Sequence, residues 1–185
     1  MSKYVLLTLL LAAPVLAQSQ PPDLRTAAGC GPATTEFDVT TDKHQHAVAQ
    51  PESGKALIYV IEDVRNPQAM SFGKVTTRVG LDGSWVGANH GNSYLSFAAE
   101  PGQHSMCTDW QYFLKRAQKL SGAADLTLEA GKTYYYRSEV TIPSNGRGDD
   151  VGNGQEGQVK LTAVDPSEGL LLISRSASST WKARK

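Results

Sequence analysis

The chain has 185 residues, of which 40% are hydrophobic and 19% are charged, and eighteen basic side chains balance eighteen acidic ones. This length suits one globular domain with an apolar core, and the apolar content excludes a chain that is disordered throughout. A formal net charge of zero excludes the overall basic field that attracts nucleic acid, so we expect no nucleic-acid partner.

The first 17 residues predict a secretory signal peptide. Lys3 supplies a positive charge, an apolar run from Tyr4 to Leu16 follows, and Ala17 offers the small side chain that signal peptidase recognises. The run is shorter than the roughly 20 apolar residues that span a membrane, so we expect no transmembrane segment. We therefore expect an exported protein, periplasmic or extracellular, that begins at Gln18.

The two cysteines, Cys30 and Cys107, are interpreted in that oxidising compartment. Two cysteines in an exported chain favour one disulfide, and the sequence has no Cys-x-x-Cys motif of a redox enzyme. A second interpretation of Cys30 is lipid modification, because the small residues Ala27–Gly29 precede it. The Pro21-Pro22 pair and the charged residues Asp23 and Arg25 separate Cys30 from the apolar run, however, which favours the disulfide over a lipid anchor.

Alternating apolar residues and turn signals predict strands over most of the remaining chain. Asp82-Gly83 is typical of a two-residue hairpin turn. About eight strands with turns every 8–12 residues predict an all-β fold, a single antiparallel β-sandwich over residues 54–164 that follows an extended leader at 18–53. The expected strands are a short one near Phe37–Val39 and others at 55–63, 75–81, from 85, 94–98, 104–112, 125–129, 133–142 and 158–164.

The strand expected at 133–142 has two distinct faces. Tyr134, Tyr136, Ser138 and Val140 alternate with Tyr135 and the charged residues that follow it. The pattern then changes, because Asp165, Pro166 and Glu168 occupy the positions of a helix cap, a first helical residue and a third. We expect a short C-terminal helix that ends near Ser174, and a basic tail to Lys185.

The order of these motifs resembles a known bacterial family. The motifs are the run Gly54–Val60, Asp82-Gly83, Pro101-Gly102-x-His104, the segment Leu126–Tyr135 and the segment Val164–Gly169. They resemble the exported family catalogued as domain of unknown function number twenty-eight forty-six, which is similar to the PEGA and transthyretin-like β-sandwiches. The resemblance covers roughly residues 54–164. It implies a small envelope protein and supplies no catalytic residues.

Motifs for enzymatic chemistry are absent from the sequence. It has no Gly-x-Ser-x-Gly, no His-Glu-x-x-His and no phosphate-binding loop, so we expect a protein that is not an enzyme and has no cofactor. We expect no metal either, because His44 and His46 lack a third ligand nearby. The segment 149–154 resembles the start of a calcium loop, but a loop aligned from Asp149 would have Val151 and Lys160 at ligand positions. A hydrolase with a carboxylate pair drawn from Glu62, Asp63, Glu100 and Glu139 stays open as an alternative.

Two groups of side chains are candidates for binding. The basic group comprises Lys115, Arg116 and Lys119, with further positive charges in the C-terminal tail. It suggests an envelope-associated interaction module whose partner is another envelope protein or a cell-wall polymer. The alternatives are that these charges are solvated or that the acidic segment 149–156 neutralises them.

Aromatic side chains make up the second candidate group. An exposed row of rings on neighbouring strands would bind sugars, which makes a carbohydrate-binding module the alternative function. The same rings would otherwise form cross-strand pairs that stabilise a sheet. The candidate residues of this group are Trp85, Tyr94 and Trp110.

Overall fold

The structure is a computed structural model that describes residues 23–46, 48–64, 75–111, 120–141 and 158–184. The predicted signal peptide and the segments 65–74, 112–119 and 142–157 lie outside these ranges. The described elements are α1 (Leu24–Ala27), β1 (Phe37–Asp42), β2 (Ala56–Val64), β3 (Thr76–Leu81), β4 (Ser84–His90), β5 (Ser93–Ala99), β6 (Gly102–Gln111), β7 (Ser121–Leu128), β8 (Thr133–Thr141), β9 (Gln158–Val164), α3 (Pro166–Arg175) and β10 (Ala177–Ala183).

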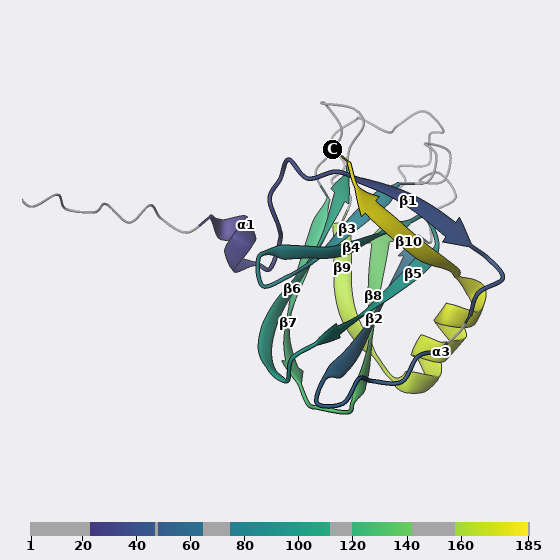
Figure 1. The fold of residues 1–185 in the computed structure, drawn as a ribbon. Helices are drawn as coiled ribbons and strands as arrows, with labels where there is room; N and C mark the ends of the chain where they lie inside the picture. The colour runs from purple at the N-terminus through teal and green to yellow at the C-terminus, as the bar shows by residue number, and fades with distance from the viewer. Residues whose placement is uncertain (1–22, 47, 65–74, 112–119, 142–157, 185) are drawn as a thin grey trace, which may run out of the picture.

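Two β-sheets pack face to face (Figure 1). One sheet has six strands in the order β1-β10-β5-β2-β8-β9, and the other has four in the order β4-β3-β6-β7. The all-β prediction is therefore confirmed, but the expectation of about eight antiparallel strands is wrong. The described chain has ten strands, and the β2–β8 and β10–β5 pairs are parallel.

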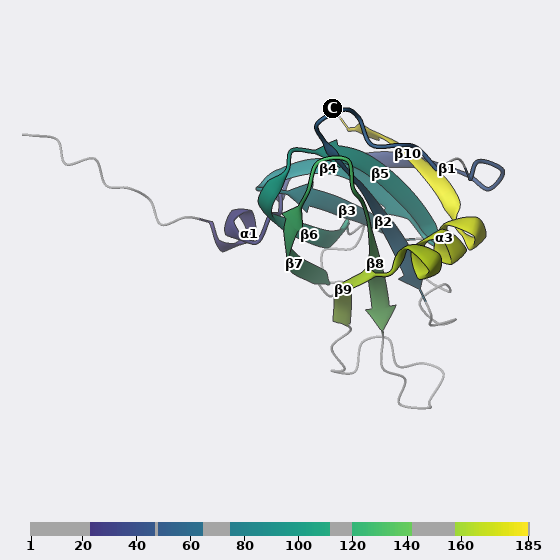
Figure 2. The same cartoon turned by 90° about the horizontal axis from the view of Figure 1, so that it is seen from below.

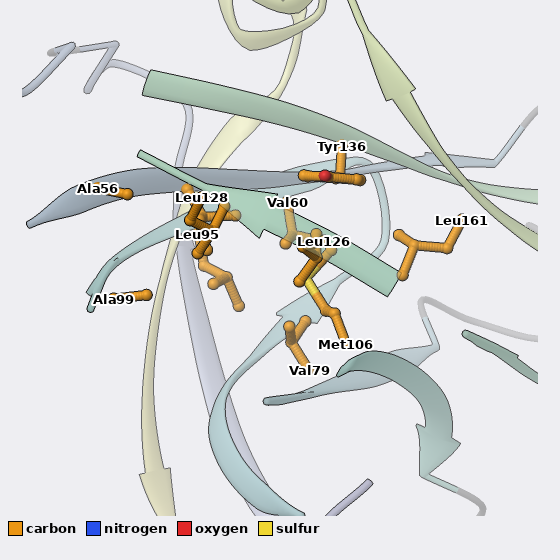
Figure 3. Packing of buried hydrophobic residues seen from close by; sticks show 11 residues of the cluster. Ala56, Val60, Val79, Leu95, Ala99, Met106, Leu126, Leu128, Tyr136 and Leu161 are labelled. Atoms are coloured by element: carbon orange, nitrogen blue, oxygen red, sulfur yellow. The ribbon is translucent and has the colours of Figure 1, made fainter. Parts of the chain in front are cut away.

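The apolar core lies between the sheets (Figure 3). Ile58 and Val60 of β2 meet Val79 of β3 and Met106 of β6, and all four side chains have no exposed area. The other face of β2 is buried as well, because α3 covers it and packs Ile173 into a second apolar cluster (Figure 2). Burial on both faces explains why β2 is apolar almost throughout.

The hairpin between β3 and β4 confirms the predicted turn. Asp82 has a φ of 49° and Gly83 a φ of 82°, so both residues lie in the left-handed region. Two such residues match the right-handed twist of the strands that they join. Leu81 pairs with Ser84 directly across the turn, which fixes the register of the hairpin.

The predicted C-terminal helix is confirmed as α3. The Asp165 carboxylate accepts hydrogen bonds from the backbone N–H groups of Ser167 and Glu168, as an N-cap should. The chain after Arg175 differs from the expected basic tail, because residues 177–183 form β10 and pair with β1. The sandwich therefore extends into both the leader and the C-terminal segment.

Six strand ends meet at one end of the sandwich, which we call the Trp110 end. Trp110, Leu120 and Val140 form an apolar cluster there, and residues at the ends of β2, β3 and β9 pack against it. The strands that flank the segments 65–74, 112–119 and 142–157 therefore end at this cluster. The last described residue before the segment that carries Lys115, Arg116 and Lys119 is Gln111 of β6.

Candidate functional site

A disulfide holds the leader against the outer face of the four-stranded sheet. Cys30 of the leader is bonded to Cys107 of β6, with 5.0 Å between their Cα atoms. This confirms the predicted pairing and falls within the usual range for a disulfide. Because the Cys30 sulfur is bonded to Cys107, it is not free for the lipid modification that was the alternative.

Arg78 of β3 is the second attachment of the leader. Its guanidinium donates to the backbone carbonyls of Ala33 at 3.0 Å and Thr35 at 2.7 Å. It also forms an ion pair with Asp109, the residue opposite it on β6, which Arg25 of α1 approaches to 3.0 Å. Both partners of the Arg78–Asp109 pair are buried, so the leader shields this ion pair from water.

Trp85 of β4 completes the attachment. Arg78 lies 4.7 Å from the centre of the Trp85 ring, and the indole N–H donates to the Pro32 carbonyl at 2.8 Å. A Cβ atom on Gly31 would come within 2.6 Å of the ring, so glycine is required for this close approach. The Trp85 ring therefore contacts Arg78 and the leader of the same chain.

The other two aromatic candidates are buried. Tyr94 is 5% exposed and Trp110 is 8% exposed. The Tyr94 hydroxyl donates to the Gln45 carbonyl of the chain between β1 and β2. Together with the engaged Trp85, these positions provide no exposed row of rings. Sequence analysis did not single out Trp181 of β10, which is 36% exposed and packs against Gly87.

A polar depression lies near the hairpin turn, with a volume of about 400 Å³. The His104 ring approaches the Asp82 carboxylate at 2.6 Å through Nδ1 and the Glu100 carbonyl at 2.8 Å through Nε2. Next to it, the Ser105 hydroxyl donates to Asp125 at 3.1 Å. A serine, a histidine and two carboxylates therefore meet here, and these are the side-chain types of a catalytic triad.

The hydrogen bonds make His104 a double donor. A carbonyl oxygen only accepts, so Nε2 carries hydrogen, while Nδ1 donates to the Asp82 carboxylate. The bond to Asp82 and the Glu100 carbonyl raise the pKa of His104 despite its partial burial. Partial burial tends to raise the pKa of Asp82, but hydrogen bonds from His104 and the Ser105 backbone outweigh it and lower that pKa.

This arrangement does not support nucleophilic catalysis. A general base needs an unprotonated ring nitrogen directed at the nucleophile, whereas both nitrogens of His104 are used as donors. The Ser105 hydroxyl is directed at Asp125 rather than at the ring. The cluster is therefore suited to holding the turn against β6.

Within the described ranges the chain shows neither a metal cluster nor a membrane-spanning helix. No group of three or more histidine, cysteine, aspartate or glutamate side chains in those ranges could hold a metal ion. No helix in the same ranges is long and apolar enough to cross a membrane. The segment 149–154 considered as a calcium loop lies outside them.

Gln111, at the end of β6, is hydrogen-bonded to the edge of β1 that faces away from the C-terminal strand β10. The Gln111 side-chain amide accepts from the Phe37 N–H at 2.6 Å and donates to the Phe37 carbonyl at 2.9 Å. Phe37 in turn pairs with Ala183 of β10. Residues 111 and 183 therefore lie on opposite edges of β1, an arrangement that the sequence did not indicate.

Part of the charge in the C-terminal segment is neutralised locally. Arg184 forms ion pairs with Glu36 at 2.8 Å and with Asp38 at 2.7 Å. Lys182 is exposed and lies opposite Asp38 in the β1–β10 register. Lys115, Arg116 and Lys119 lie outside the described residues, in the segment of sequence between Gln111 and Leu120.

No protein-family model matches the chain, and no curated protein is significantly similar to it. The family resemblance carried by the strand and turn motifs therefore stays a hypothesis.

Proposed function

We propose that this protein is an exported, non-enzymatic interaction module of the cell envelope that binds an anionic partner through the Trp110 end. The observation that carries the proposal is the contact of Gln111 with Phe37, the partner of Ala183. It places Gln111, the last described residue before the basic segment, at the edge of β1 that faces away from the C-terminal strand β10.

The disulfide supports the exported location. A bond between Cys30 and Cys107 persists in an oxidising compartment, as the predicted signal peptide requires. The double-donor state of His104 supports a non-enzymatic role at the polar depression, where serine, histidine and carboxylates would otherwise suggest hydrolysis. A negatively charged cell-wall polymer or lipid head group is the partner chemistry that Lys115, Arg116 and Lys119 favour.

The test is binding of the mature, oxidised protein to vesicles of anionic lipid and, separately, to a purified anionic wall polymer. We expect binding that weakens steeply with salt, since the Debye length falls from about 10 Å at 0.1 M to about 3 Å at 1 M. The double variant Lys115→Glu/Arg116→Glu should lose most of this binding. A matched variant, Lys43→Glu/Lys132→Glu, changes the charge equally at exposed positions away from the basic segment and should retain it.

Three results would distinguish the alternatives. Equal binding by both double variants would remove the proposed role of the basic segment. Binding to neutral glycans that quenches tryptophan fluorescence and is insensitive to salt would support the carbohydrate-binding alternative instead. Binding to the polymer but not the vesicles would identify which anionic partner is recognised.

A further inference from the structure

A layer of polar side chains crosses the sandwich core between the main apolar cluster and the Trp110 end. These side chains come from both sheets, and none is more than 2% exposed. Such groups are normally buried only when they are hydrogen-bonded, so each of them should have a hydrogen-bond partner. The members are Glu62 of β2, Thr77 of β3, Asn89 of β4, Thr108 of β6 and Ser138 of β8.

Two hydrogen bonds in this layer join one sheet to the other. The Thr77 hydroxyl donates to Glu62 Oε1 at 2.6 Å. The Asn89 Nδ2 donates to the carbonyl of Val60 at 3.0 Å. Val60 precedes Glu62 by two residues on the same strand, so both side chains lie on the same face. The second bond fixes the orientation of the Asn89 amide, because only the nitrogen of the amide can donate.

Two acceptor atoms in the layer are left without a donor. Glu62 Oε2 and Asn89 Oδ1 are buried and have no hydrogen-bond partner within the described part of the chain. Thr108 Oγ1 and Ser138 Oγ in the same layer also have no hydrogen-bond partner within the described part of the chain, so hydroxyl donors are present. An ionised carboxylate can only accept, and it would bury a full negative charge here. A protonated carboxylic acid would instead supply one donor from Oε2 and keep Oε1 as the acceptor for Thr77.

The charged neighbours of Glu62 do not compensate a negative charge at this position. Successive residues of a strand point to opposite faces, so the ionisable residues next to this layer lie on the outer faces of the sheets. Arg78 and Asp109 contact the leader there, and Arg137 contacts Glu168 of α3. The remaining ionisable neighbours on the packed strands are Asp63 of β2, His90 of β4 and Glu139 of β8.

We propose that Glu62 is an internal proton-binding site, which carries a proton at neutral pH and ionises when the two sheets separate. Burial supports this assignment, since it raises the pKa of Glu62 from 4.5 to about 8, with the Thr77 hydrogen bond opposing the shift. Proton release and opening of the sandwich next to the Trp110 end are then linked. The inference does not depend on the proposed anionic partner.

The direction of the pH dependence follows from this linkage. The folded state holds the proton more tightly than the unfolded state, in which the pKa is close to 4.5. The stabilisation is therefore complete below that pKa and is lost as the pH rises towards about 8. Above it, ionised Glu62 contributes the same penalty at every pH.

The test compares urea unfolding of the mature, oxidised wild type with that of Glu62→Gln from about pH 5 to about pH 9. Glutamine is neutral at every pH, can still accept from Thr77, and carries a nitrogen that can donate. The unfolding constant of the wild type should rise relative to that of Glu62→Gln by up to about tenfold per pH unit below pH 8. At pH 8 the variant should be the more stable protein.

The control is Glu129→Gln, which removes a carboxylate from an exposed position and should give a ratio to wild type that is flat over this range. A flat ratio for Glu62→Gln as well, or a variant that is less stable at every pH, would show that Glu62 is ionised and accepts from hydroxyls such as Ser138. If Glu62→Gln does not fold, carbon-13 NMR of the Glu62 carboxyl in the native wild type decides. A carboxylate signal throughout pH 5 to 7 would overturn the proposal.

Discussion

Arg78 lies over the ring of Trp85, 4.7 Å from its centre, while the same guanidinium holds two carbonyls of the leader. One side chain thus connects β3, β4, β6 and a segment more than forty residues away. The cation gains from the ring face and from the buried Asp109 carboxylate. The leader therefore belongs to the folded domain.

Substitution of Arg78 should show this directly. Arg78→Met keeps an apolar contact with Trp85 but leaves Asp109 buried with only Arg25 nearby. We expect a loss of about 3–5 kcal/mol in the free energy of unfolding, the usual range for one partner removed from a buried ion pair. Urea unfolding measures the loss, and limited proteolysis should detect earlier cleavage before Phe37.

The control is Arg25→Ala, because the Arg25 side chain is 34% exposed and contacts the same carboxylate. The Arg25→Ala variant should lose much less free energy of unfolding than Arg78→Met, because ion pairs that are partly exposed contribute little to stability. Equal effects of the two substitutions would show that the hydrogen bonds to Ala33 and Thr35 contribute little.

The Cys30–Cys107 disulfide should stabilise the folded protein as a covalent cross-link. The double variant Cys30→Ser/Cys107→Ser removes a cross-link between positions 77 apart in sequence. The chain-entropy model gives roughly 4 kcal/mol for a loop of this length. Unfolding in urea with and without reductant measures it. The double variant should be insensitive to reductant, and a wild type that is equally insensitive would contradict the prediction.

His104 should titrate above the ordinary range for histidine. The hydrogen bond to Asp82 raises the pKa of His104, so its stabilising contribution is complete below about pH 6.5 and is lost as the pH passes the raised value. Asp82→Asn keeps a residue that tolerates the left-handed backbone but removes the charge. NMR titration should then show a lower His104 pKa.

An unchanged His104 pKa in the variant would mean that the Glu100 carbonyl, rather than Asp82, determines the charge of the ring. The polar depression would then be less strongly coupled to the hairpin turn.

Local chemistry made part of this fold predictable. Asp82-Gly83 tolerates positive φ, Asp165 caps a helix, and the alternation along β8 follows from a strand with two different faces, as the burial of Tyr136 and Val140 confirms. The Cys30–Cys107 bond was predictable because the chain has only two cysteines.

Non-local pairing was not predictable in the same way. Residues 177–183 contain small polar side chains with little apolar alternation, and they form β10 because β1 supplies a partner. Likewise, Arg78 and Asp109 become an ion pair only once β3 and β6 adopt their register. The strands of the parallel β2–β8 pair are far apart in sequence, because all four strands of the other sheet lie between them along the chain. No local sequence pattern indicates this pairing.

Gln111 provides the last prediction, at the contact that carries the proposed function. Its amide satisfies both the N–H and the carbonyl of Phe37, as a neighbouring strand would. Gln111→Ala should cost about 1–3 kcal/mol, the range for partly buried polar groups that lose their partner. Gln111→Glu should be at least as damaging, because a carboxylate cannot donate to the Phe37 carbonyl and repels it.

Hydrogen exchange of the β1 amides measures this effect together with urea unfolding. Exchange at β1 and β10 should accelerate in both variants while β2 stays protected, because β1 pairs with β10 along its length and not with β2. Gln103→Ala, at an exposed position of the same strand, is the matched control and should leave exchange unchanged. If the Gln111 variants also bind anionic vesicles normally, the contact orders β1 without positioning the basic segment, and the proposed binding end would have to be formed by the segment alone.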